Sequence, residues 1–143
     1  MVMVMGYCGC ARTLGGRARL LVRPRGRRLR RGDSTQELLL KVRTFVQTMQ
    51  SQGVHTIVGG DWNLTPTQLQ RHDWLHQAGL TAVYDDLTEP TCRRTGRGTP
   101  RLLDFFAISK ALGPSCLGVR IRKEFVATPH WPVQLLIQQE WAE

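Results

Sequence analysis

The first 32 residues contain no aspartate, glutamate or asparagine, although nine arginines lie among them. The rest of the chain carries eleven basic and eleven acidic side chains, so the net charge of +9 belongs to the N-terminal segment alone. Such a basic arm is typical of segments that bind nucleic acid or another polyanion. A solvated, disordered tail is the alternative interpretation. We predict an Arg-rich segment over residues 1–33, a short strand followed by a loop or disorder, and a domain over residues 34–143.

Closely spaced cysteine pairs of the metal-binding type are missing, and so are long apolar runs. The four cysteines stand at positions 8, 10, 92 and 116 and form no CxxC pair, which disfavours a structural zinc site. The opening residues do not form a secretory signal, so we expect reduced thiols and an intracellular location, nuclear or cytoplasmic. No apolar run approaches the length of a membrane span, so we expect no membrane partner. The sequence does not indicate an oligomeric state.

Two helices are predicted from caps and apolar spacing. Ser34 and Glu37 form a capping box in front of a helical apolar stripe, and Gly53 is the natural end of that helix. Thr65 caps a second helix, which has proline at its first position and is predicted to end at Gly79.

Strands are predicted where apolar residues run together or alternate with polar ones. The run at residues 54–58 ends at two glycines, and the run at residues 102–109 is apolar on both faces, as in an internal strand. Polar residues and turn formers predict a long loop over residues 85–100. The other predicted strands cover residues 2–7, 119–126 and 133–139. Helix, strand and helix followed by further strands indicate a layered α/β domain.

A carboxylate and an amide follow the strand at residues 54–58. In an extended segment the side chains of Asp61 and Asn63 point the same way, and Trp62 points to the other side. Gly59 and Gly60 have no side chains, so the backbone of a substrate can approach closely there. This pair is suited to polarising a water and contacting a phosphate oxygen. An ordinary turn at a strand end is the alternative interpretation.

A second carboxylate, Asp104, lies between apolar pairs inside the strand at residues 102–109. A carboxylate in such surroundings requires a partner. His130 is the candidate, because it precedes the last strand, where a side chain can face a pocket. A structural histidine is the alternative interpretation.

The order of these motifs resembles the endonuclease/exonuclease/phosphatase superfamily, which includes apurinic, pancreatic-type and retrotransposon endonucleases. The motifs are Gly-Asp-x-Asn, Leu-Asp-Phe-Phe in a strand, and His-x-Pro-Val. The resemblance covers residues 34–139, the C-terminal half of the family fold, and Thr91-Cys92 is similar to the family's Pro-Thr segment. It implies part of a four-layer α/β/β/α sandwich.

The resemblance also implies metal-dependent hydrolysis of a phosphodiester in nucleic acid, with Mg²⁺ or Mn²⁺ as cofactor. Asp61 would activate the attacking water and contact the metal, and Asn63 would contact the scissile phosphate. Asp104 would orient His130, which would stabilise the charge of the pentacovalent phosphorane. The candidate substrate contacts are Arg93, Arg94, Arg97 and Tyr7, with Met5 as the alternative to Tyr7 and an ordinary solvated loop as the alternative interpretation of the arginines.

The chain departs from the family pattern at two places. Pro129 stands where the family has an aspartate, and proline neither binds metal nor accepts a proton. Residues 1–32 also lack the asparagine and the metal-binding glutamate of the family's N-terminal half. We therefore expect a truncated gene product. The alternative is a non-catalytic remnant that binds nucleic acid through its basic N-terminal arm. The ancestral substrate, whether DNA, RNA or phosphoinositide, stays open.

Overall fold

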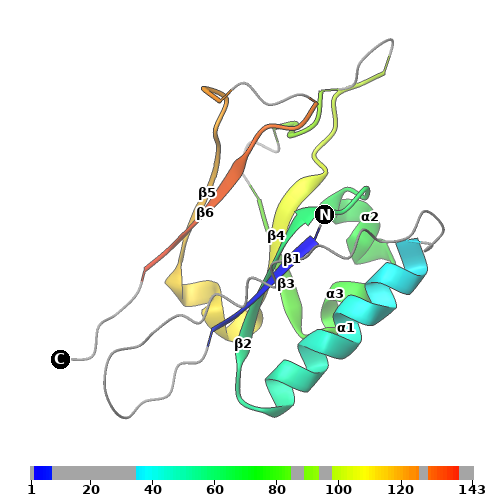
Figure 1. Ribbon diagram of the computed structural model, residues 1–143, viewed down its shortest axis with the longest axis vertical. Helices are drawn as coiled ribbons and strands as arrows, with labels where there is room; N and C mark the ends of the chain where they lie inside the picture. Colours follow the sequence, from blue (N-terminus) through cyan, green and yellow to red (C-terminus); the bar gives the residue numbers. More distant parts are fainter. Residues whose placement is uncertain (1, 8–34, 85–88, 94–97, 126–128, 139–143) are drawn as a thin grey trace.

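The computed structural model describes residues 2–7, 35–84, 89–93, 98–125 and 129–138 (Figure 1). Most of the Arg-rich segment, including its expected loop, lies outside these residues, and so do Ser34, Arg94 and Arg97. The described part is a mixed α/β structure with two small antiparallel sheets.

The larger sheet has the strand order β1-β2-β4-β3. Its strands are β1 (Val2–Tyr7), β2 (His55–Asp61), β4 (Asp104–Ser109) and β3 (Leu80–Val83). The smaller sheet pairs β5 (Cys116–Ile121) with β6 (Val133–Ile137). The predictions of a first strand at residues 2–7 and of an internal strand that contains Asp104 are therefore confirmed.

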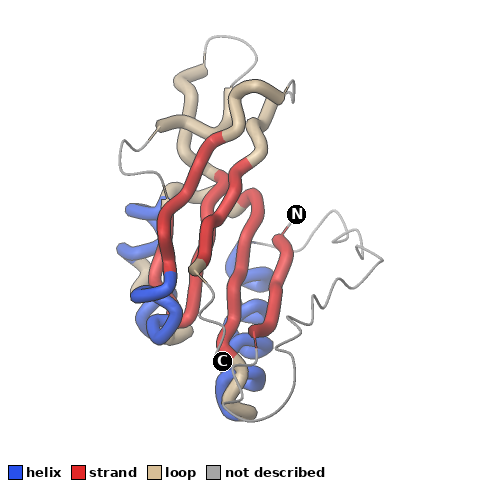
Figure 2. The backbone as a smooth tube through the Cα atoms, turned by 90° about the vertical axis from the view of Figure 1, so that its left-hand side faces the viewer, coloured by secondary structure: helices blue, strands red, loops and turns tan. Residues whose placement is uncertain are grey.

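The helices and the small sheet lie on opposite sides of the larger sheet (Figures 1 and 2). Alternate side chains of β2 and β4 explain this arrangement. Val58 and Phe105 pack against the helices, whereas Ile57 and Ile108 pack in a second cluster that includes Leu135 of β6. Because both faces of the two central strands are covered, their apolar runs are continuous rather than alternating. The four-layer sandwich remains a prediction.

The helix α1 (Thr35–Ser51) ends as predicted, since Gly53 has a φ of 72°. The second predicted helix is divided in two, α2 (Pro66–Arg71) and α3 (Trp74–Gln77), a break that was not predicted. Gly79, with a φ of 67°, follows the end of α3 as predicted. The capping box of Thr65 is present. Asp73 interrupts the helix with a φ of 54°, and Trp74 after it is buried and donates its indole N–H to the Leu39 carbonyl.

Several predicted strand boundaries were wrong, since β4 begins at Asp104 rather than at residue 102 and β6 ends at Ile137 rather than at residue 139, and the strand β3 was not predicted. The strand β2 continues through both glycines to Asp61, because Gly59 and Gly60 pair with β1 on one side and with β4 on the other. The strand β5 begins at Cys116, earlier than predicted, after a 3₁₀ turn, η1 (Lys110–Ser115). In the described part of the chain, no helix is both long and apolar enough to cross a membrane.

The close contact at Gly59 generates a stability prediction. A Cβ at this position would lie 2.7 Å from the ring of Phe106, so Gly59→Ala requires the ring or the backbone to shift. We expect the free energy of unfolding in urea to fall by about 1–3 kcal/mol. Gly113→Ala is the matched control, since a Cβ there meets nothing within 4 Å. Equal stabilities of the two variants would contradict the packing argument.

Candidate functional site

The antiparallel register of β2 and β4 places two carboxylates side by side. Asp61 is the last residue of β2 and Asp104 is the first of β4, and the two residues are direct partners in the ladder. The turn after Asp61 is anchored by Trp62, which is buried, stacks on Phe105 and donates its indole N–H to the Phe105 carbonyl at 3.0 Å. Trp62 therefore packs in the core beside the helices.

A buried threonine fixes the carboxylate of Asp104. The Thr91 hydroxyl donates to Asp104 Oδ2 at 2.7 Å and accepts the backbone N–H groups of Leu103 and Asp104 at 3.0 and 2.9 Å. Thr91 is completely buried. One side chain therefore satisfies two backbone donors and also holds the orientation of the carboxylate.

A short irregular ladder brings His130 to the same place. Cys92 bridges both to Arg101 and to His130, so the segment at residues 91–93 lies between the chain that enters β4 and the chain that enters β6. Between the segment at residues 91–93 and the segment around His130, the Trp131 N–H donates to the Thr91 carbonyl at 2.8 Å, and the Arg93 N–H donates to the Pro129 carbonyl at 2.7 Å. His130 is thereby held by backbone hydrogen bonds on either side of it.

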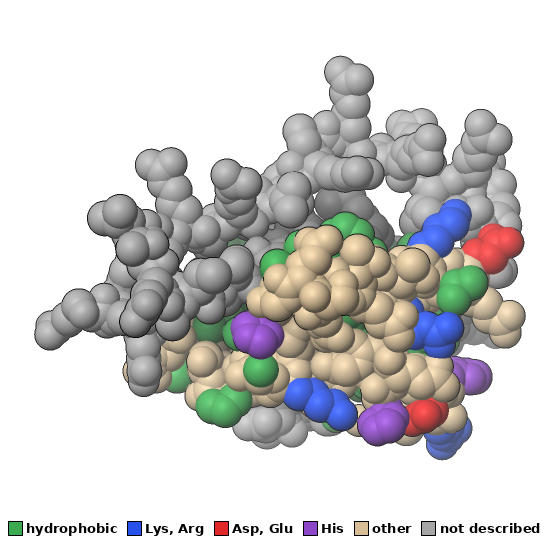
Figure 3. Space-filling model, turned by 90° about the horizontal axis from the view of Figure 1, so that it is seen from below, with side chains coloured by type: hydrophobic (Ala, Val, Ile, Leu, Met, Phe, Trp, Pro, Cys, Tyr) green, Lys and Arg blue, Asp and Glu red, His purple; other side chains and the backbone are tan. Residues whose placement is uncertain are grey.

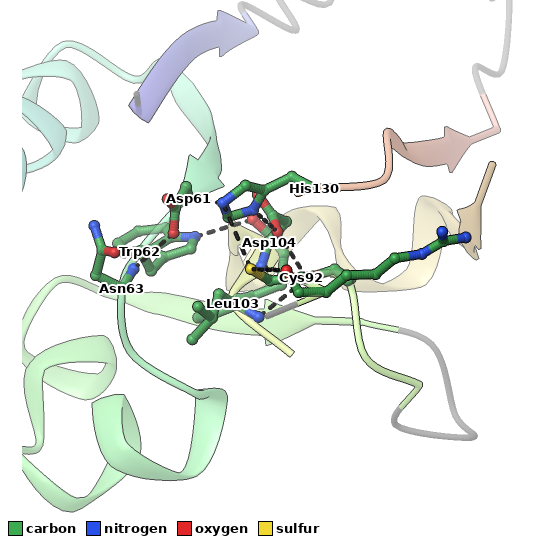
Figure 4. Close-up of polar contacts among 10 residues, drawn as sticks. Asp61, Trp62, Asn63, Cys92, Leu103, Asp104 and His130 are labelled. Carbon is green, nitrogen blue, oxygen red and sulfur yellow. Dashed lines mark hydrogen bonds and ion pairs between the residues drawn. The ribbon is translucent and has the colours of Figure 1, made fainter. Parts of the chain in front are cut away.

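The imidazole of His130 lies between the two carboxylates (Figure 4). Its Nδ1 is 2.7 Å from Asp104 Oδ2, a hydrogen-bond distance. Its Nε2 is 3.6 Å from Asp61 Oδ2 and 3.7 Å from Cys92 Sγ. The three predicted residues 61, 104 and 130 therefore converge, and all of them are partly buried.

A pocket of about 310 Å³ opens beside this group. Its walls are the start of β4, the segment that enters β6, and Gly60, whose missing side chain leaves room next to the carboxylates. The residues that line it are Gly60, Asp104, Phe105, Phe106, His130, Trp131, Pro132 and Val133. Asp104 and His130 therefore face a space that a ligand can enter, whereas Asp61 is not among the lining residues.

The other predicted site residues are placed differently. Asn63 is exposed with a φ of 52°, so the chain is not extended there, and its backbone N–H donates to Asp61 Oδ1 at 3.0 Å. In Figure 4, Asn63 lies on the far side of Asp61 from His130. Tyr7 pairs with His55 at the opposite end of β2, about 20 Å from Asp61 by strand length, so the structure does not bring it to the site.

The rim of the site combines cations with aromatic rings. The Arg93 guanidinium lies over the Trp131 ring at 4.1 Å, and the Lys123 ammonium lies 5.7 Å from the same ring. Lys123 also pairs with Glu89. Away from the rim, basic, acidic and histidine side chains are interspersed on the face shown in Figure 3, which has no basic patch among the described residues.

Sequence reasoning missed the parts played by Thr91 and Cys92. The only signal for Thr91 was its similarity to a Pro-Thr segment, which suggested no hydrogen bonds. Nothing in the sequence indicated that Cys92 would contact His130, because the two residues are 38 positions apart.

The convergent group offers ligands to a metal ion. Asp61, Asp104 and His130 each supply one ligand atom, and these atoms lie within 4.8 Å of one another. Carboxylate oxygens suit Mg²⁺ and Mn²⁺, whereas imidazole nitrogen suits Zn²⁺ and its neighbours in the transition series. The donor set therefore fits a divalent cation without selecting one of these metals.

No protein-family model matches the chain, and neither a curated protein nor a solved structure is significantly similar to it.

The bonds of Thr91 generate a second prediction. Thr91→Val removes the hydroxyl and leaves two backbone N–H groups and one carboxylate oxygen without this partner. We expect the free energy of unfolding to fall by about 1–3 kcal/mol. Thr91→Ser keeps the hydroxyl and removes only a methyl group. Its free energy of unfolding should therefore fall by only about 1 kcal/mol.

Denaturant unfolding of both variants tests the role of the hydroxyl, with Thr81→Val, at an exposed position of β3, as the control. A serine variant as unstable as the valine variant would show that packing of the methyl group, and not the hydroxyl, carries the effect.

Proposed function

We propose that this chain is a divalent-metal-dependent phosphodiester hydrolase of the endonuclease type, which acts on nucleic acid. The observation that supports it is the convergence of Asp61, Asp104 and His130 beside an open pocket. The three residues come from separate parts of the chain, and the resemblance assigns them to one reaction. On this proposal the chain contributes to a four-layer sandwich and acts in the nucleus or cytoplasm.

Asp61 is the proposed general base. Its Oδ1 accepts the backbone N–H of Asn63, and its Oδ2 faces the imidazole, so the carboxylate is oriented at the strand end. It can accept a proton from a water that attacks the phosphorus from the pocket side. The amide of Asn63, which is exposed, is the proposed contact to the scissile phosphate.

His130 is the proposed electrostatic partner of the transition state. With Nδ1 donating to Asp104, its Nε2 is directed toward the space next to Asp61. A proton on Nε2 can be donated to a phosphorane oxygen, where negative charge develops. Thr91 and Asp104 keep the ring in this orientation, so little reorganisation is needed during the reaction.

The residues present fit a divalent cation, with the Asp61 carboxylate as its first ligand. Mg²⁺ and Mn²⁺ bind through one or two carboxylates, waters and substrate phosphates, so a site with few protein ligands is compatible with them. Such an ion supplies neutralisation of phosphate oxygens and stabilisation of the leaving alkoxide. Pro129, which is exposed, contributes no ligand.

The rim supports a polyanionic substrate. Arg93 is exposed, and its guanidinium is stacked on Trp131, the residue after His130, so it is pre-oriented at the rim of the pocket and available to a phosphate. We propose the same role for Arg94 and Arg97 and a wider electrostatic role for the basic N-terminal arm.

The test is cleavage of supercoiled plasmid by the full chain in Mg²⁺ and, separately, in Mn²⁺. We expect Asp61→Asn, Asp104→Asn and His130→Ala each to lower the rate at least about 100-fold, because each removes a proton-transfer or charge-stabilising group. Asp73→Asn and His76→Ala are the matched controls, since both side chains are exposed and remote from the pocket.

Absence of cleavage in the wild type would overturn the hydrolase proposal. If the chain then bound DNA in a salt-sensitive manner that deletion of residues 1–32 abolished, the non-catalytic, arm-mediated alternative would be supported instead.

A further inference from the structure

We propose that Cys92 and His130 form the core of a binding site for a thiophilic divalent cation, with Zn²⁺ as the chemical type and Asp61 as a further ligand after its side chain adjusts. The imidazole Nε2 lies 3.7 Å from Cys92 Sγ and 3.6 Å from Asp61 Oδ2. A thiol, an imidazole and a carboxylate are the three ligand types that proteins use for zinc.

The two distances suit a bridging ion. With metal–ligand bonds of about 2.0–2.3 Å, tetrahedral geometry separates two ligand atoms by about 3.4–3.6 Å. Both distances from Nε2 lie near this range, so an ion can bond to Nε2 together with either neighbour after a small side-chain adjustment. Cys92 and His130 are also paired through their backbones, which fixes the separation of the two chain segments.

The hydrogen bonds behind the ligands support the assignment. A metal-bound histidine usually donates its other ring N–H to a carboxylate, and His130 Nδ1 does so to Asp104 at 2.7 Å. Asp104 is in turn fixed by the Thr91 hydroxyl. On the other side, the Asn63 N–H occupies Asp61 Oδ1 and leaves Oδ2 directed at the imidazole. Asp61 Oδ2 is therefore directed at the imidazole, whereas the Cys92 thiol also donates to the Arg93 carbonyl at 3.7 Å and must release this hydrogen bond to bind the ion.

The chemistry of the donors selects the metal. Mg²⁺ prefers oxygen ligands and gains little from a thiolate, whereas Zn²⁺ binds thiolate and imidazole well. Two nearby carboxylates, Asp61 and Asp104, add favourable negative charge for a divalent cation. Zn²⁺ bound in this way would occupy the imidazole and the carboxylate that the proposed hydrolase uses. Binding itself does not depend on hydrolysis.

The test uses Co²⁺ as a spectroscopic substitute for Zn²⁺. The full-length chain carries Cys8→Ser and Cys10→Ser, so that the N-terminal cysteines cannot contribute a thiolate. Co²⁺ is titrated under reducing conditions, and the thiolate-to-cobalt charge-transfer band in the near ultraviolet is recorded. Zn²⁺ is then added as a competitor, and circular dichroism confirms that each variant is folded.

We expect a saturable band that Zn²⁺ displaces. Cys92→Ser should abolish it, and Cys116→Ser, at the other cysteine in the described part of the chain, should leave it unchanged. His130→Ala should weaken Zn²⁺ binding by more than tenfold, and Asp104→Asn by about 10–100-fold, as for partners behind a metal ligand.

Two results would overturn the proposal: no thiolate band in the parent chain, or a band of unchanged intensity in Cys92→Ser. The rate of alkylation of Cys92 is a second measurement, and Zn²⁺ should slow it at least tenfold if the thiol is a ligand. Neither measurement involves a phosphodiester. Failure of the zinc-site proposal is therefore distinguishable from failure of the proposed hydrolase activity.

Discussion

The hydrogen bond between Asp104 and His130 is the constraint on which the site depends. It joins the first residue of β4 to the segment that enters β6, and so it links the larger sheet to the smaller one. The carboxylate is itself oriented by Thr91, which is completely buried. A chain of three side chains, Thr91 to Asp104 to His130, thus extends from the protein interior to the pocket.

The architecture of the sheet supplies the second carboxylate. Because β2 and β4 are antiparallel and in register at their ends, Asp61 is placed beside Asp104 without any specific contact between the two side chains. The glycines before Asp61 permit this, since Gly59 accommodates the Phe106 ring and Gly60 opens the pocket wall. Both the hydrolase and the metal site that we propose use this single arrangement. They differ in whether Nε2 of His130 faces a phosphate or a cation.

Features of the fold that depend on local chemistry could be predicted from the sequence alone. The cap at Thr65, the end of α1 at Gly53 and the partner required by Asp104 follow from a few neighbouring residues or from the cost of burying a charge. Features that depend on tertiary pairing were not predictable. The strand β2 continues through two glycines because neighbouring strands supply hydrogen bonds, and Cys92 reaches His130 only through an irregular ladder. Tyr7 was assigned to the site without knowledge of its register, which places it at the opposite end of β2.

The most direct measurement of the central claim is the NMR spectrum of the imidazole nitrogens and their protons, in the wild type and in Asp104→Asn. If the histidine is held as described, His130 Nδ1 carries a proton that exchanges slowly with water and resonates at low field, and the substitution removes that signal. Resonances of His130 that match those of the exposed residues His72 and His76 in the wild type, and that do not change in Asp104→Asn, would contradict the account.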